Sequence, residues 1–309
     1  MDEKTSKNTG KWNDTDLPDL TGRTAVVTGA NSGIGLTAAD ALARVGAHVV
    51  FAVRDLERGR AAAATVRGST EVRRLDLADL RSVRDFAAGW RDPIHVLINN
   101  AGVMMLPRQQ TRDGFEMQFG TNHLGHFALT NLLLPYVQDR VVTVSSGAHR
   151  WGAVTIDFDD LNLTAGYTPR RAYAQSKLAN LLFTLELQRR LTESGSPVRA
   201  FAVHPGYAAT KLQSHAANPV LRAFMAIGNR FMAQDDRAGA LPTLYAATQD
   251  LPGASYVGPD GRGEMRGAPT LVGRTRAASD PAEARRLWTV SEELTGVNWP
   301  SRQPAAAQR

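Results

Sequence analysis

Short apolar runs alternate with longer amphipathic segments along most of the chain. Strand-like runs rich in Val, Ala and Ile occupy Thr24–Thr28, Ala47–Val53, Glu71–Leu77, His95–Ile98, Arg140–Val144 and Val198–Val203. Helical spacing of apolar residues covers Ile34–Val45, Leu56–Val66, Leu80–Trp90, Glu116–Val137, Ala172–Leu191 and Pro281–Leu294. Strands that alternate with helices of this length predict βαβ units and a parallel sheet.

The strands are apolar at nearly every position, which is typical of a sheet covered by helices on both faces. We therefore predict a single α/β domain over residues 21–309, with a doubly wound, Rossmann-type parallel sheet of about seven strands. Residues 1–20 form a polar N-terminal tail. The rhythm changes after Gly206, where bulky apolar residues fill the segment 207–235. This segment is expected to be either a lid over a substrate or a helical hairpin packed on the core or on a dimer partner.

Composition removes several classes of function. The chain has no cysteine, which excludes disulfides, thiol nucleophiles and cysteine-ligated metals. With 43% hydrophobic and 21% charged residues it has the composition of a globular protein. It has no apolar run long enough to span a bilayer and no apolar leader at its N-terminus, so we expect a cytoplasmic protein without a membrane span.

The net charge of +6 comes almost entirely from arginine. Only five residues are lysine, and only Lys177 and Lys211 lie within the predicted domain. No nucleic-acid-binding motif or lysine-rich arm accompanies the positive charge, so we do not expect nucleic acid as a partner. A lysine inside this arginine-rich fold requires a specific explanation.

A glycine-rich turn joins the first strand to the first helix. Glycines there let the backbone approach a ligand closely, and the free N–H groups of the helix N-terminus favour a pyrophosphate. The turn is therefore expected to bind a dinucleotide through Thr28, Gly29, Asn31, Ser32, Gly33, Ile34 and Gly35.

The end of the second strand indicates which dinucleotide is preferred. An acid at this place commonly holds the ribose 2′-hydroxyl of NAD, whereas an arginine can pair with the 2′-phosphate of NADP. Uncharged Val53 is followed here by Arg54 and then Asp55. We therefore expect NADP(H) to be preferred over NAD(H), although Asp55 could partly neutralise Arg54.

Tyr173 and Lys177 are four residues apart in a helical segment and therefore lie on one face, one turn apart. A nearby ammonium favours the phenolate and lowers the pKa of a tyrosine, which suits Tyr173 to general acid/base chemistry. An exposed pair on an amphipathic helix is the alternative.

Two serines, Ser145 and Ser146, end the fifth strand, where ligands bind in parallel sheets. Either can hydrogen-bond a reacting oxygen, and we favour Ser146.

His123 and His126 are three residues apart on a predicted helix. A metal site needs further ligands, so packing roles are favoured for both. Asn122, which precedes them, has two interpretations: a polar helix residue bonded to backbone, or a part of the site.

These motifs together resemble those of the short-chain dehydrogenase/reductase superfamily, from about Leu20 to Glu293. The matching segments are T-G-x-x-x-G-x-G at Thr28, N-N-A-G at Asn99, Y-x-x-x-K at Tyr173 and P-G at Pro205. N-H-L-G-H-F at Asn122 and the long gap between Ser146 and Tyr173 are closest to the retinol dehydrogenase-like branch; the protochlorophyllide reductase-like branch is also near. The chain lacks the apolar N-terminal anchor of many retinol enzymes and the cysteine of the protochlorophyllide enzymes, so neither substrate is carried over.

The resemblance implies an NADP(H)-dependent oxidoreductase that interconverts a carbonyl and an alcohol. It implies that Tyr173 supplies the proton, Ser146 polarises the oxygen, Lys177 tunes Tyr173 and grips the ribose, and Asn122 holds a relay water. It places the cofactor against Asp76, Leu77, Asn100, Ala101, Gly102, Tyr173, Lys177, Pro205, Gly206 and Thr210. Asp76 has an alternative role as a helix cap.

The substrate is expected to be a fairly bulky, apolar small molecule. Its pocket is assigned to Met104, Trp151, Leu212 and Phe224, which carry apolar side chains beside the predicted site. A non-catalytic NADP-binding regulatory protein on the same fold is the alternative function. A homo-oligomer is possible because the helix that carries Tyr173 is long and apolar enough for an interface of the family's type.

Overall fold

The computed structural model describes residues 11–152, 154–206 and 236–300. Within these ranges a sheet of eight strands runs in the order β3-β2-β1-β4-β5-β6-β7-β8. The strands are β1 (Thr24–Thr28), β2 (His48–Val53), β3 (Ser69–Arg74), β4 (Ile94–Asn99), β5 (Val137–Val144), β6 (Arg199–Val203), β7 (Tyr256–Pro259) and β8 (Pro269–Leu271). The order reverses between β1 and β4, which is the topological switch point at which α/β sheets bind ligands.

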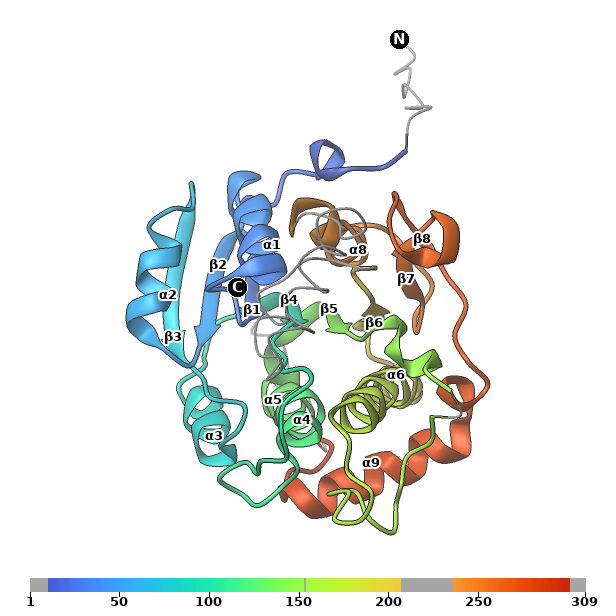
Figure 1. Ribbon diagram of the computed structural model, residues 1–309. Coiled ribbons are helices and arrows are strands. Elements are labelled where there is room, and N and C mark those ends of the chain that lie inside the picture. Colours follow the sequence, from blue (N-terminus) through green and yellow to red (C-terminus); the bar gives the residue numbers. More distant parts are fainter. Residues whose placement is uncertain (1–10, 153, 207–235, 301–309) are drawn as a thin grey trace, which may run out of the picture.

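Helices cover both faces of the sheet, which confirms the expected doubly wound α/β fold (Figure 1). The core on one face combines side chains of α1, α2 and α8 with the sheet, and the core on the other combines those of α3, α5, α6 and α9. The helices are α1 (Gly33–Arg44), α2 (Leu56–Ala63), α3 (Leu80–Ala88), α4 (Met117–Phe119), α5 (Gly125–Leu133), α6 (Pro169–Glu193), α8 (Asp236–Thr248) and α9 (Pro281–Thr295).

The structure differs from the sequence prediction in two details. The sheet has one strand more than about seven, and its edge strand β8 is antiparallel to β7. Both β7 and β8 are short and lie in a Gly- and Pro-rich region, where apolar periodicity is too brief to indicate a strand. The expected helix 116–137 is divided into α4, a π-helical segment Gly120–Leu124, α5 and a 3₁₀ turn that contains Pro135. Proline removes a helix donor, so the chain leaves the helix there and enters β5.

Helix α9 packs on the outer side of α6 (Figure 1). The ring of Trp288 in α9 stacks on Phe183 of α6 with a centroid distance of 5.8 Å. Part of the apolar α6 surface that suggested an oligomer interface is thus covered within the same chain. In the described part of the chain, no helix is both long and apolar enough to cross a membrane.

The segment that leads into β1 is anchored to the domain. The ring of Trp12 meets Tyr245 of α8 edge-on at 5.1 Å. Asp14, which is 7% exposed, accepts hydrogen bonds from Arg44 of α1 and Arg237 of α8. Burial alone would raise the pKa of Asp14, but the hydrogen bonds from the two guanidinium groups outweigh burial and hold its pKa below the ordinary 3.8.

We expect Asp14→Asn to lower the free energy of unfolding by about 1–3 kcal/mol at neutral pH, because hydrogen bonds to charged groups are lost at a buried position. The lowered pKa means that Asp14 stabilises the fold above pH 3.8 and ceases to do so as the pH falls below that value. Urea unfolding between pH 3 and 7 measures the difference, which should shrink in acid. Asp85→Asn is the control, because the Arg81–Asp85 ion pair is exposed. A loss no larger than that of the control would contradict the anchoring role.

Candidate active site

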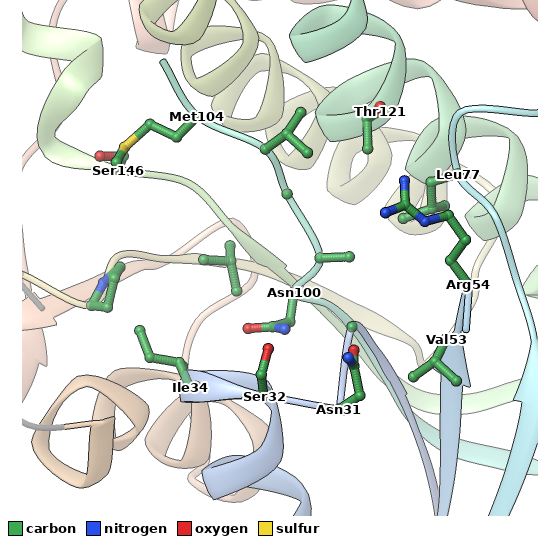
Figure 2. A pocket seen from close by; sticks show the side chains of 18 of the residues that line it. Asn31, Ser32, Ile34, Val53, Arg54, Leu77, Asn100, Met104, Thr121 and Ser146 are labelled. Carbon is green, nitrogen blue, oxygen red and sulfur yellow. The ribbon is translucent and has the colours of Figure 1, made fainter. Parts of the chain in front are cut away.

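A cavity of about 450 Å³ opens at the carboxyl ends of the parallel strands. Figure 2 shows Val53 and Arg54 at one end of it, Asn100 near its centre, and Met104 and Ser146 at the other end. The sequence-predicted residues that line it are Gly29, Asn31, Ser32, Gly33, Ile34, Gly35, Arg54, Asp76, Leu77, Asn100, Ala101, Gly102, Met104, Ser146, Trp151, Tyr173, Lys177, Pro205 and Gly206. Thr210, Leu212 and Phe224 lie outside the described residues.

The N-terminus of α1 faces this cavity without a side-chain cap. Ser32 holds the N-cap position but makes no capping hydrogen bond, whereas side chains cap α2, α3, α6 and α9. The first turn of α1 also contains no acid. Its free N–H groups and the positive end of the helix dipole therefore remain available to an anion.

Glycines make room for the backbone to reach such an anion. A Cβ on Gly35 would lie 2.4 Å from the Asn100 amide nitrogen and 2.7 Å from the carbonyl oxygen of Gly29. Gly29 itself has a φ of +67°, a conformation that L side chains rarely adopt. The turn therefore fits the pyrophosphate of a dinucleotide.

Thr28 does not line the cavity, but it holds two cavity loops together. Its hydroxyl accepts hydrogen bonds from the backbone N–H groups of Asn100 and Ala101, both at 2.9 Å. The Asn100 side-chain amide donates to the Thr28 carbonyl at 2.8 Å. His126 lies 2.9 Å from the Thr28 hydroxyl, and its Nδ1 donates to the carbonyl of Asn122 at 3.0 Å. Burial lowers the pKa of His126 to about 4, so this ring is neutral and structural.

Two arginines lie at the β2 end of the cavity. Arg54 directly follows β2, and Arg58 is in the first turn of α2. The carboxylate of Asp55 accepts the backbone N–H of Arg58 as the α2 cap. Among the described residues, neither Arg54 nor Arg58 forms an ion pair with a carboxylate. Arg58 was not predicted from the sequence; its signal was a second arginine four residues after Arg54.

Asp76 and Leu77 follow β3 and border the same part of the cavity. The cap of α3 is Asp79, which accepts from the backbone of Arg81 and Ser82, so Asp76 is free of the capping role considered for it. The Asp76 carboxylate accepts the N–H of Ala78 at 3.1 Å.

Tyr173 and Lys177 lie together on the cavity side of α6, as their spacing predicts. The Lys177 ammonium is 5.7 Å from the centre of the Tyr173 ring and donates to the Val144 carbonyl at 3.0 Å. Burial raises the pKa of Tyr173 to about 12, although a hydrogen bond with Ser146 opposes this rise. Burial also lowers the pKa of Lys177 to about 8. Burial thus outweighs the lowering of the Tyr173 pKa that we expected from Lys177.

The two serines after β5 have different surroundings. Ser145 is 1% exposed. Its hydroxyl donates to the Lys177 carbonyl at 2.7 Å, which fixes β5 to α6. Ser146 begins the 3₁₀ turn Gly147–Arg150, and its hydroxyl accepts the N–H of Ala148 at 3.1 Å. Because the Ser145 hydroxyl is committed to the Lys177 carbonyl, Ser146 is the serine better placed to donate to a ligand in the cavity.

Asn122 is buried in the π-helical segment and binds the loop that follows β4. Its amide donates to the Val103 carbonyl at 2.9 Å and accepts the Val103 N–H at 2.8 Å. A Cβ on Gly102 would lie 3.1 Å from the Asn122 oxygen and 3.7 Å from the Lys177 nitrogen, so the three residues meet. His123 points away to α9, where its Nε2 is 2.9 Å from the Ser291 hydroxyl.

The apolar end of the cavity is formed by Met104, Met105 and Trp151. The Trp151 ring is 6.0 Å from that of Tyr173 and is 40% exposed. The backbone N–H of Met105 donates to the Gln118 side chain, which also contacts Tyr167. These bonds fix the loop after β4 against the segment that precedes α6. No local signal in the sequence indicated this link, because it joins residues that are 49 positions apart.

Comparisons with known proteins agree with these motifs. The sequence model described as "short chain dehydrogenase" matches residues 23–158. Human "Retinol dehydrogenase 13" is 44% identical over 91% of this chain and 87% of its own length. Mouse "Polyprenol dehydrogenase" is 41% identical over 91% and 86%. A crystal structure of a protein from Mycobacterium Paratuberculosis, 54% identical, covers 94% of this chain and 100% of its own, with a TM-score of 0.82.

We expect Gly35→Ala to weaken dinucleotide binding at least tenfold, because the new methyl group would force the loop of Gly29 or Asn100 away from the ligand path. Isothermal titration with NADPH measures the change. Gly273→Ala is the matched control, since a Cβ there meets nothing within 4 Å. Equal affinities for the two variants would contradict the assignment of this turn as the pyrophosphate site.

Proposed function

The chain belongs to the short-chain dehydrogenase/reductase family, in its retinol dehydrogenase-like branch, and from this premise we propose that it is an NADP(H)-dependent oxidoreductase that interconverts an alcohol and a carbonyl on a bulky apolar substrate. One observation carries the proposal. The uncapped α1 terminus, the two unpaired arginines and the Ser146–Tyr173–Lys177 group line a single cavity in the described chain.

The residues present fit a phosphorylated dinucleotide. The backbone N–H groups at Gly33, Ile34 and Gly35 would hold the pyrophosphate, and Arg54 with Arg58 would hold the 2′-phosphate. Asp76 and Leu77 would hold the adenine, and Pro205 and Gly206 also line the cavity. The bound dinucleotide supplies or accepts the hydride.

Tyr173 is suited to donate a proton to a carbonyl oxygen. Its pKa of about 12 keeps the phenol protonated at neutral pH, and Ser146 lines the same cavity. Ser146 can donate to the same oxygen as negative charge develops on it. In the reverse direction the phenol must first lose its proton, and a positive charge on Lys177 and on an oxidised cofactor favours that loss.

Lys177 is placed to bind a ribose as well as to act on Tyr173. One N–H of its ammonium donates to the Val144 carbonyl, which leaves two N–H groups for a ligand. Asn122 is held beside Gly102 and Lys177 by its bonds to Val103. We propose that Asn122 positions a water near Lys177, through which the proton of Tyr173 is replaced.

The substrate class follows from the apolar end of the cavity and from the relatives. Met104, Met105 and Trp151 present thioether and indole groups beside Tyr173 and Ser146, which suit a hydrocarbon chain or an isoprenoid better than a sugar or an acid. The relatives are named for retinol and polyprenol, which are both isoprenoid alcohols. We therefore propose an isoprenoid or similar apolar aldehyde and alcohol as the substrate pair.

We expect Tyr173→Phe to lower kcat about 10²–10⁴-fold with an apolar aldehyde such as retinal, because the proton donor is removed. The Kd for NADPH should change less than about threefold, since the phenol is not needed for the pyrophosphate contacts. NADPH absorbance and fluorescence titration measure the two quantities, and Tyr245→Phe on α8 is the control. Retained turnover would remove Tyr173 from its role. Tight NADPH binding by the wild type without turnover of any carbonyl would favour the regulatory alternative.

We expect Arg54→Ala to weaken NADPH binding about 10–100-fold and NADH binding hardly at all, because a charge-assisted hydrogen bond to the 2′-phosphate is lost. Arg58→Ala should also weaken NADPH binding more than NADH binding, and the double variant should bind the two cofactors about equally. Arg60→Ala on the same helix is the control, because Arg60 does not line the cavity. An equal loss for NADPH and NADH in Arg54→Ala would show that the 2′-phosphate is bound elsewhere.

A further inference from the structure

A carboxylate from the β7–β8 connection lies between the segments that follow β5 and β6. Glu264 forms a bidentate ion pair with Arg150, with distances of 2.7 Å from Nη1 to Oε2 and 3.2 Å from Nη2 to Oε1. Its Oε2 is also 3.0 Å from Nε2 of His204. Glu264 thereby connects the turn after β5 with the end of β6, although 114 residues separate it from Arg150.

The His204 branch leads to the backbone of the P-G turn. The N–H of Gly206 donates to His204 Nδ1 at 3.3 Å, so the ring proton is on Nε2 and is donated to Glu264. His204 is 2% exposed and burial lowers its pKa to about 4, so the ring is neutral at pH 7. A Cβ on Gly258 of β7 would lie 2.0 Å from the His204 nitrogen. Glycine at this place is what allows the ring to reach Glu264.

The Arg150 branch leads to Ser146. Arg150 is the last residue of the 3₁₀ turn that Ser146 begins, and its guanidinium also donates to the Gly273 carbonyl beyond β8. Within this turn, His149 Nδ1 donates to the Ser146 carbonyl at 2.7 Å. The Ser146 hydroxyl accepts the N–H of Ala148. Holding Arg150 therefore holds the turn on which the Ser146 hydroxyl is mounted.

The tip of the β7–β8 connection is shaped to deliver this carboxylate. Gly263 and Glu264 both have left-handed backbone conformations, with φ values of +65° and +55°. The left-handed region costs a non-glycine residue about 1 kcal/mol or more, so the contacts of the Glu264 side chain must offset it. Backbone bonds from Glu264 to Gly261 and from Gly261 to Arg266 close the loop around this conformation.

We propose that Glu264 is a positioning residue, which sets Ser146 and the Pro205–Gly206 turn at the spacing that hydride transfer requires. Glu264 does not line the cavity, and it acts through Arg150 on the turn that carries Ser146 and through His204 on the Pro205–Gly206 turn. The ends of β5 and β6 already lie side by side, since the N–H of Ser145 donates to the Val203 carbonyl at 2.7 Å. Beyond that bond, Glu264 joins the segments that follow the two strands. The proposal rests on the oxidoreductase function proposed above.

The test compares Glu264→Ala and Glu264→Gln with the wild type and with Glu71→Ala, a control that breaks the distant Glu71–Arg73 ion pair. Glu264→Ala should lower kcat with retinal and NADPH about 10–100-fold, because a misplacement of about 1 Å costs that much in an oriented reaction. The Kd for NADPH should change less than about threefold, because the pyrophosphate and 2′-phosphate contacts are unaffected. Glu264→Gln should have an intermediate kcat, since an amide offers one accepting oxygen in place of the two that Arg150 and His204 share.

Activity is expressed per NADPH-binding site, so a variant that partly misfolds does not imitate the effect. Hydrogen–deuterium exchange supplies a readout that does not depend on turnover. Backbone amides in 146–152 and 203–206 should exchange faster in Glu264→Ala, whereas those of α1 and β3 should not. The Glu71→Ala control should leave the first two segments unchanged.

The outcomes separate this proposal from the one on which it rests. A wild type without carbonyl turnover would contradict the proposed function, and the exchange pattern would then decide the role of Glu264 alone. An active wild type with unchanged kcat in Glu264→Ala would overturn the positioning role, as would uniform exchange across the molecule. A loss of NADPH affinity that matches the loss of kcat would assign Glu264 to cofactor binding instead.

Discussion

The uncapped N-terminus of α1, held at the switch point of a parallel sheet, is the constraint on which the rest of the structure depends. The sheet places the ends of β1, β4, β5 and β6 at one edge, and the Thr28 hydroxyl joins the first two of them by its bonds to Asn100 and Ala101. Glycine at position 35 is needed because any side chain there would meet Asn100. Once these loops are fixed, the free N–H groups of α1 are available to the phosphates of a ligand.

Burial then decides the chemistry at the other end of the cavity. Tyr173 and Lys177 are both almost fully buried, and desolvation disfavours the charged form of each. The pKa of the phenol rises to about 12 while that of the ammonium falls to about 8, so two values that are ordinarily almost equal move apart. A cavity of this kind holds its proton on Tyr173 until a ligand changes the local charge.

A second polar network, separate from the Tyr173–Lys177 group, organises the ends of β5 and β6. Its members come from three connections: the turn that carries Ser146, the residues around His204 and the β7–β8 loop. The carboxylate of Glu264 satisfies a guanidinium and an imidazole at once. Polar networks of this kind specify one arrangement of loops, because each donor left without its partner would carry a desolvation cost.

Much of the fold and site is determined by local pattern. Continuous apolar strands require a covered sheet, the glycine spacing around Gly33 requires a close approach, and the four-residue interval from Tyr173 to Lys177 requires a shared helix face. These inferences need only neighbours in sequence. The break of the helix 116–137 and the strands β7 and β8 were missed, since short elements are determined by what they pack against. Local pattern also could not assign Arg58 to the cavity or separate Ser146 from Ser145. Nor could it find the bridge from Glu264 to Arg150 and His204. Hydrogen-bond partners that are far apart in the chain are brought together only by the tertiary structure.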